Sequence, residues 1–191
     1  MNVLELSDKY KETADSFLGE SKLLSVLEKY SRIEFEGAYA GNVMLHGDID
    51  IKVIGPKDYG NDEIFKVLKD IHDTCGDHIR SLFIKADWDD PRFGQQYPYG
   101  KYIGLKTLLN AERWKVDIWF ISETEAARER NVLDIARVQL SESQRLQILE
   151  CKQYRKEHNL KISGQEIYEV VLNTSYISPE ESFKSKSSTP Q

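Results

Sequence analysis

One short segment limits what this chain can fold into, because charged and apolar residues alternate along it without a fault. Residues 48–54 read DIDIKVI, with Gly47 before them and Gly55-Pro56 after. Successive side chains of a β-strand point to opposite faces of the sheet. The pattern therefore predicts a half-buried strand that carries Asp48, Asp50 and Lys52 on one face and apolar residues on the other.

A second segment alternates in the same way and carries one more acid. Residues 114–120 read WKVDIWF, so Asp117 points away from its apolar neighbours. If the two strands are neighbours, Asp48, Asp50 and Asp117 converge on one face. Like charges a few Å apart raise each other's pKa, and a divalent cation removes that conflict. Ligands that are all oxygen suit Mg²⁺ or Mn²⁺, so we predict these three carboxylates as metal ligands.

Apolar spacing and breaker residues place the remaining elements. We expect helices at 8–29 (split near Gly19 and Ser21), 61–75 and 163–172, one or two helices within 124–158 broken near Ser141, and strands at 32–36, 81–86, 101–108 and 113–121. The fold class is α+β, a mixed β-sheet with flanking helices and a C-terminal helical segment. The expected domains are a core at 1–122, a helical segment at 123–173 and a mobile tail at 174–191.

Charge and composition bear on the class of partner. The 191 residues have a formal net charge of −6, and the basic residues are scattered. A protein that grips long nucleic acid usually carries a basic stripe, so the sequence argues against such a partner. Because it shows neither a signal peptide nor an apolar run of membrane-spanning length, we expect a cytoplasmic protein with no membrane contact.

Three motifs together resemble a known family. Residues 36–42 (EGAYAGN), 46–51 (HGDIDI) and 116–118 (VDI) are similar to the signature of the polymerase-beta-like nucleotidyltransferases. By motif order the resemblance covers about residues 20–122. It implies that Asp48 and Asp50 bind two metal ions, that Asp117 helps to bind one and takes the acceptor's proton, and that the turn at Gly37 binds a triphosphate.

The resemblance has one departure. Ala38 stands where the family has Ser, so the hydroxyl that would reach a phosphate is missing. Such a hydrogen bond to a charged group contributes about 1.5–3 kcal/mol. The Ala38 backbone N–H, or a side-chain donor from Tyr39 or Asn42, could replace it. Lys52, on the carboxylate face, is the best lysine for a phosphate contact. The predicted nucleotide-binding residues are thus Gly37, Ala38, Tyr39 and Lys52.

Other interpretations stay open beside these. Asp87 is the rival third carboxylate. His72, Cys75 and His78 suggest zinc, although a helix that ends at Gly76 explains them more simply. Stacking on a base is expected from Tyr97 and Tyr99 rather than from the aromatic residues of the strands, and the other candidate lysines are Lys101, Lys106 and Lys115.

The sequence leads to two functional hypotheses. The first is a metal-dependent nucleotidyltransferase that moves a nucleoside monophosphate from an NTP, with ATP as first choice, to a hydroxyl of a small molecule or a protein. The second, favoured by Ala38, is a non-catalytic or weakly catalytic member that works as a regulatory partner of another protein, as an antitoxin does.

Overall fold

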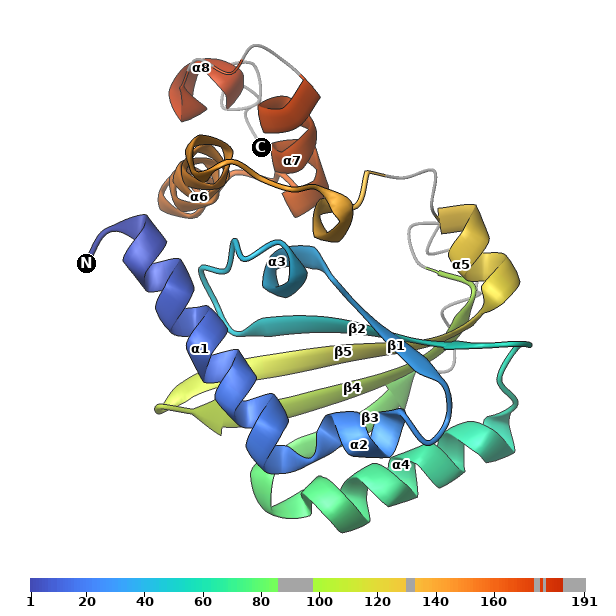
Figure 1. Cartoon of the computed structure of the whole chain (residues 1–191). Helices are drawn as coiled ribbons and strands as arrows, with labels where there is room; N and C mark the ends of the chain where they lie inside the picture. Colours follow the sequence, from blue (N-terminus) through green and yellow to red (C-terminus); the bar gives the residue numbers. More distant parts are fainter. Residues whose placement is uncertain (86–97, 130–132, 174–175, 177, 184–191) are drawn as a thin grey trace.

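A mixed five-stranded sheet forms the centre of the molecule (Figure 1). The computed structural model describes residues 1–85, 98–129, 133–173, 176 and 178–183. The strands are β1 (Arg32–Glu36), β2 (Asp48–Gly55), β3 (Ser81–Lys85), β4 (Gly100–Leu109) and β5 (Glu112–Ser122). Their order is β1-β2-β5-β4-β3, and β2 with β5 is the parallel pair; the other neighbours are antiparallel. The α+β fold class predicted from the sequence is confirmed.

Three helices cover one face of the sheet. They are α1 (Val3–Ser21), α2 (Leu23–Leu27) and α4 (Asn61–Cys75), which a short 3₁₀ turn, η1 (Gly76–His78), follows. The main hydrophobic cluster lies between these helices and the apolar residues of the strands, among them Ile49, Ile51 and Ile118, each fully buried. The aspartates of β2 and β5 and Lys52 therefore lie on the opposite, charged face, as the alternation predicted.

The chain enters its first helix earlier than the apolar spacing indicated. Asn2 caps α1, because its side chain accepts a hydrogen bond from the Glu5 backbone and the Glu5 carboxylate accepts one from the Asn2 backbone. This capping box fixes the start of the helix. The predicted split lies at Lys22, whose left-handed backbone (φ 60°) separates α1 from α2.

The strands expected at 101–108 and 113–121 form a hairpin across Asn110. β4 and β5 pair from Gly100 with Ile121 to Leu109 with Glu112. The two residues between them, Asn110 and Ala111, both have positive φ, as two-residue hairpins of type I′ require. This tight turn sets the register that places Gly104 opposite Asp117.

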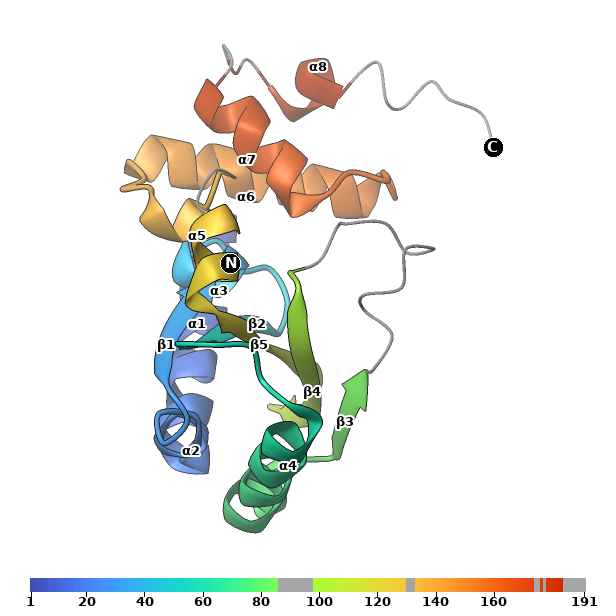
Figure 2. The ribbon, with the colours of Figure 1, turned by 90° about the vertical axis from the view of Figure 1, so that its right-hand side faces the viewer.

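The C-terminal helices form a second layer beyond the charged face (Figures 1 and 2). They are α5 (Glu123–Glu129), the 3₁₀ turn η3 (Ile135–Arg137), α6 (Glu142–Glu157), α7 (Gly164–Asn173) and α8 (Pro179–Phe183). A separate hydrophobic cluster joins η3, α6, α7 and α8 to Val43 and Leu45, next to the very short α3 (Gly37–Ala40). Ser141 begins α6 with a capping box, in agreement with the predicted break there.

One expectation about this part differs from the structure. The described residues before Ser141 do not form one long helix, since α5 ends at Glu129 and residues 133–140 contain the single turn η3; Asp134 accepts a hydrogen bond from the Ala136 backbone and starts that turn. Farther along the chain, α8 is helical and Phe183 is buried in the second cluster. Among the described residues, no helix is long and apolar enough to cross a membrane.

Candidate active site

Three carboxylates meet on the charged face of the sheet. The parallel pairing of β2 with β5 sets Asp50 opposite Asp117 and Asp48 opposite Lys115. One oxygen of each of the three aspartates lies within 4.8 Å of an oxygen of the other two. Within the described ranges this is the one cluster of acidic, histidine or cysteine side chains that could hold a metal ion. The oxygen-only donor set fits Mg²⁺ or Mn²⁺.

The pKa values of the paired carboxylates on β2 are shifted in opposite directions. Burial and, after it, the charges of Asp48 and Asp117 together raise the pKa of Asp50 to about 7. Burial also acts on Asp48, but a hydrogen bond from His46 and the charge of Lys115 outweigh it and lower the pKa of Asp48. Close carboxylates behave in this way when no cation lies between them. A bound divalent ion would let Asp50 ionise as well.

The third carboxylate is held by two neighbours. Lys115 Nζ lies 2.9 Å from Asp117 Oδ2 and 3.0 Å from Asp48 Oδ1, so one ammonium bridges two acids. The Tyr102 hydroxyl donates a 2.7 Å hydrogen bond to Asp117 Oδ1. Burial opposes the charge of Lys115, yet Asp48 and Asp117 raise its pKa above the usual range. These contacts fix the orientation of Asp117.

The turn after β1 brings its backbone against the same cluster. Gly37 has φ +61°, a left-handed value that favours glycine. A Cβ atom there would lie 2.4 Å from Asp50 Oδ2. Ala38 follows and is half-buried. The Tyr39 side chain does not join the cluster, because it packs on Phe35 and its hydroxyl donates to Asp15.

Lys52 lies on the charged face, as predicted, but its ammonium is engaged by other acids. Its side chain is buried and pairs with Glu36 and, at 2.6 Å, with Glu129 of α5. Burial lowers the pKa of Lys52, but these two carboxylates outweigh it and raise the value. The lysine thereby ties the helical segment to the sheet. A phosphate contact from Lys52 stays a prediction.

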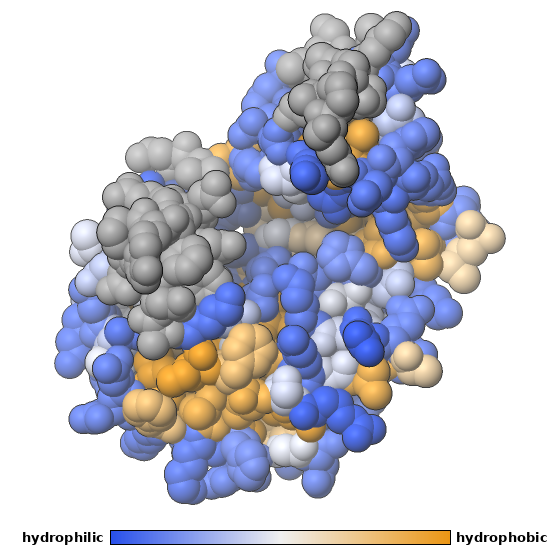
Figure 3. All heavy atoms as spheres, turned by 180° about the vertical axis from the view of Figure 1, so that it is seen from behind, coloured by the Kyte–Doolittle hydropathy of each residue, from blue (hydrophilic) through white to orange (hydrophobic). Residues whose placement is uncertain are grey.

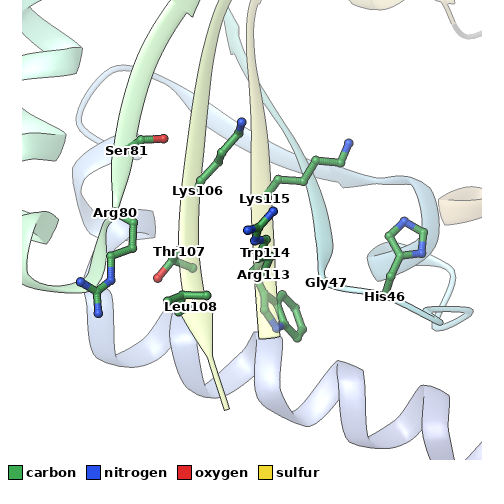
Figure 4. A pocket seen from close by; sticks show the side chains of 10 residues that line it. All are labelled: His46, Gly47, Arg80, Ser81, Lys106, Thr107, Leu108, Arg113, Trp114 and Lys115. Carbon is green, nitrogen blue, oxygen red and sulfur yellow. The ribbon is translucent and has the colours of Figure 1, made fainter. Parts of the chain in front are cut away.

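Two cavities border the cluster and both reach His46, whose Nε2 lies 3.5 Å from Asp48 Oδ2. The smaller one, about 280 Å³, lies between His46 and α6 and is lined by Lys152, Arg155 and Lys156. The larger one, about 710 Å³, lies along β4 and β5 and is lined by Lys106, Arg113 and Lys115 (Figure 4). From behind, the molecule is hollowed between the helical segment and the sheet (Figure 3).

Lys152 is the most buried cation of the helical segment. Its Nζ donates a 2.8 Å hydrogen bond to the Val43 carbonyl, and it lies 5.2 Å from the centre of the Tyr168 ring. Burial, followed by the charge of Arg155, lowers the pKa of Lys152 to about 7, although Asp48 and Asp50 act in the opposite direction. The charges of Asp48 and Asp50 therefore act on the pKa of this lysine, which lines the smaller cavity.

The alternative residues have different outcomes. Asp87 and Tyr97 lie outside the described residues, and the Tyr99 side chain is exposed. His72 is exposed on α4 whereas Cys75 is buried beneath it, so the structure does not bring the suggested zinc ligands together. Lys101 lies on β4 at the edge of the core, away from both cavities.

The sequence reasoning missed several residues that surround the carboxylates. It treated Lys115 only as one of several lysines that could contact a phosphate. Yet the alternation that puts Asp48 and Asp50 on one face also puts Lys115 on the same face as Asp117. It gave no role to His46, two residues before Asp48. Tyr102 and Lys152 come from elements whose position relative to β2 no local pattern reveals.

Comparison with solved structures relates the whole arrangement to known proteins. A cytoplasmic RNA terminal U-transferase matches with a TM-score of 0.53 and 11% identity over 84% of this chain and 44% of its own. The Cid1 poly(U) polymerase matches at 13% identity over 81% of this chain and 45% of its own, with TM-scores of 0.53 for a mutant bound to MgATP and 0.51 for the MgGTP-bound protein.

Sequence comparison adds no relative, since no protein-family model and no curated protein matches the chain. The chain spans less than half the length of the structures it resembles. At such identities the likeness concerns the fold. Together with the order of the strands, it shows that this chain shares the fold of the terminal U-transferase and Cid1 poly(U) polymerase structures.

Proposed function

We propose that the protein is a metal-dependent nucleotidyltransferase, which moves a nucleoside monophosphate from an NTP to a hydroxyl and releases pyrophosphate. The observation that carries this proposal is the meeting of Asp48, Asp50 and Asp117 within 4.8 Å on adjacent parallel strands. Two ions held there would stabilise the charge on the attacking and leaving oxygens of the transferred phosphoryl group.

The residues around the cluster have separate parts in this proposal. Asp48 and Asp50 would hold the ions, and Asp50 would have to be ionised to do so, since metal ligands must be deprotonated. Asp117, oriented by Tyr102 and Lys115, faces the acceptor hydroxyl and takes its proton. The turn at Gly37 and Ala38 brings backbone N–H groups toward the phosphates, and the Tyr39 backbone continues that turn.

The cationic cavity beside α6 supports a nucleotide seat on that side. Lys152, Arg155 and Lys156 line it, and His46 connects it to Asp48. Cations pair well with phosphate oxygens. The Cid1 structures hold MgATP and MgGTP. For this chain we propose an NTP, with ATP as first choice, and Mg²⁺ or Mn²⁺ as the cofactor.

A hydroxyl of a small molecule or a protein remains the proposed acceptor. The U-transferase in the comparison acts on RNA. This chain, however, has a net charge of −6 and spans less than half of that protein. The competing hypothesis of a non-catalytic regulatory protein is favoured by Ala38 and by the engagement of Lys52 with two acids.

Labelled nucleotide distinguishes the two hypotheses. The full chain is incubated with each α-labelled NTP, Mg²⁺ and a cell extract, and any acceptor that gains label is identified. We expect label on an acceptor with wild-type protein and none with Asp48→Asn or in the presence of chelator. Equal labelling by wild type and Asp48→Asn would place the activity outside this site, and no labelling with any NTP would favour the regulatory hypothesis.

A further inference from the structure

We propose that the larger cavity binds the acceptor and that this acceptor carries at least one phosphate close to its reacting hydroxyl. This inference rests on the proposed function and specifies its second substrate. The cavity is about 710 Å³, within the range of about 300–1,000 Å³ of small-molecule sites. Its lining includes Arg80, Lys106, Arg113 and Lys115 and no carboxylate, in a chain whose net charge is −6.

The position of the cavity connects it to the third carboxylate. Lys106 of β4 lies opposite Lys115 of β5, and Lys115 bridges Asp117 and Asp48. Residues two apart on a strand share a face, so Arg113, Lys115 and Asp117 form one row. Lys115, which lines the cavity (Figure 4), therefore connects it to Asp117, the carboxylate to which we assign the proton of the acceptor.

Three of the cations are not neutralised by protein. Within the described parts of the chain, Arg80, Lys106 and Arg113 make no ion pair, although Lys106 lies 5.5 Å from the Phe83 ring centre. Lys52 and Lys115, on the same sheet face, each pair with two acids. Like charges gathered in a hollow attract an anion and favour its binding.

Each of the two cavities suits one of the two substrates of the transfer reaction, the NTP and the acceptor. The α6 cavity and the β4–β5 cavity meet at His46, beside Asp48. In a two-metal displacement the attacking and leaving oxygens lie in line on opposite sides of the reacting phosphorus. With the NTP seated by α6, the attacking hydroxyl must approach from the other side, where the larger cavity opens. Leu108, 47% exposed, gives this cavity an apolar wall for the body of the acceptor.

Binding of defined probes to the full chain tests the proposal. The probes are uridine 5′-monophosphate, uridine, and a five-nucleotide single-stranded RNA with a free 3′-hydroxyl, in buffer free of phosphate and sulfate. The test variant is Lys106→Ala/Arg113→Ala. Its matched control is Lys29→Ala/Lys66→Ala, which removes the same charge from exposed lysines at α2 and α4, on the other side of the sheet. Each protein is also tested for a thermal shift with MgATP.

We expect a phosphate-bearing probe to bind wild type and the control equally and to bind the test variant at least about tenfold more weakly, with the MgATP shift unchanged in all three. If the acceptor is an RNA terminus, the RNA binds more tightly than the mononucleotide, and each lost cation lowers the slope of log affinity against log salt by about 0.7. If it is a small phosphorylated molecule, the two probes bind alike.

Three results would overturn the proposal. One is equal binding of the probes to wild type and to the test variant. Another is binding of uridine as tight as that of its monophosphate. The third is a thermal shift of the wild-type protein with MgATP but no binding of either phosphate-bearing probe. That result would leave the proposed function intact. A wild-type protein with no MgATP response would instead refute the proposed function, and the acceptor role with it.

Discussion

Asp50 is the residue at which the charges of the site conflict most directly. It is half-buried beside two other carboxylates, and burial together with their charges raises its pKa to about 7. His46 and Lys115 offset the charge of Asp48, two residues earlier on β2, and Lys115 and Tyr102 contact Asp117. A divalent ion is therefore the partner that Asp50 lacks among the described side chains.

Loss of one of the two metal-binding charges on β2 should abolish most of the activity. In Asp48→Asn and Asp50→Asn the amide replaces a charge but keeps the shape of the side chain. We expect the transfer rate to fall on the order of 10³ or more, because metal stabilisation of the phosphoryl group is worth several kcal/mol. Asp73→Asn, on α4, is the control and should keep full activity, because Asp73 is exposed and pairs only with its helix neighbours Lys69 and His72 among the described residues. Undiminished turnover in either test variant, measured with labelled NTP, would falsify the assignment.

Ala38 offers a second test at a single residue. If the turn at Gly37 binds phosphate, Ala38→Ser adds a hydroxyl that can reach a phosphate oxygen. We expect NTP binding to become tighter by about 1–2 kcal/mol, the lower part of the range for a hydrogen bond to a charged group. Adenosine has no phosphate and should bind both proteins alike. Calorimetric titration with ATP and adenosine checks this, and equal ATP affinities would mean that the turn does not contact phosphate.

At the residue scale, alternation predicted which acids share a face, but it could not predict which cations neutralise them. Lys52 and Lys115 have the same local pattern, each on a strand two residues from an aspartate. The structure pairs Lys52 with Glu36 and Glu129 and Lys115 with the metal-binding acids. The difference comes from α5, whose Glu129 lies over β2, and such a contact between distant segments is not encoded in a local window.

The turn between β1 and α3 is the element whose backbone is most constrained by the site. Gly37 has a positive φ, and a Cβ there would meet the Asp50 carboxylate. We expect Gly37→Ala to destabilise the protein by about 1–2 kcal/mol from the left-handed backbone alone, and to lower activity by displacing Asp50.

Gly19, within α1, is the matched control, because a Cβ there has nothing within 4 Å. Gly19→Ala should stabilise the protein by about 0.5–1 kcal/mol and leave activity unchanged. Urea unfolding and the labelled-NTP assay measure both effects. A Gly37→Ala protein as stable and active as Gly19→Ala would show that the close approach of this turn to Asp50 does not matter.

Elements with strong local signals could be predicted from the sequence, and those set by distant packing could not. The alternation in β2 and β5 corresponds to the structure directly. The adjacency of β2 and β5 is a property of the sheet, since about 60 residues separate them, and the sequence argument had to assume it. The segment before Ser141 has helical composition, yet a side-chain cap from Asp134 and the burial of Ile135 favour a single 3₁₀ turn.

For the whole molecule, the raised pKa of Asp50 predicts how stability depends on pH without metal. An unfolded aspartate has a pKa of about 3.9, so between about pH 4 and 7 the folded state binds more protons at this position. Stability that Asp50 contributes below pH 4 is therefore lost as pH rises through 7. Asp50→Asn cannot ionise, so we expect the metal-free variant to gain stability over wild type as pH rises from 4 to 8.

Chemical unfolding of both proteins in chelator across this range measures the difference. Addition of Mg²⁺ should reduce it, because the ion stabilises the ionised wild-type carboxylate and has less affinity for the amide. A difference between the two proteins that stays constant from pH 4 to 8 would refute the proposed conflict of charges at Asp50.

The central claim is that the three aspartates hold metal for a nucleotide, and thermal unfolding with ATP and Mg²⁺ tests it most directly. A ligand at about 100 times its Kd stabilises the native state by about 2.7 kcal/mol, which is about 5–10 °C in Tm for a chain of this size. We predict a rise of that order with ATP and Mg²⁺ together, and none with ATP in chelator or in Asp48→Asn with both ligands. An equal rise in chelator, or in Asp48→Asn, would contradict the account.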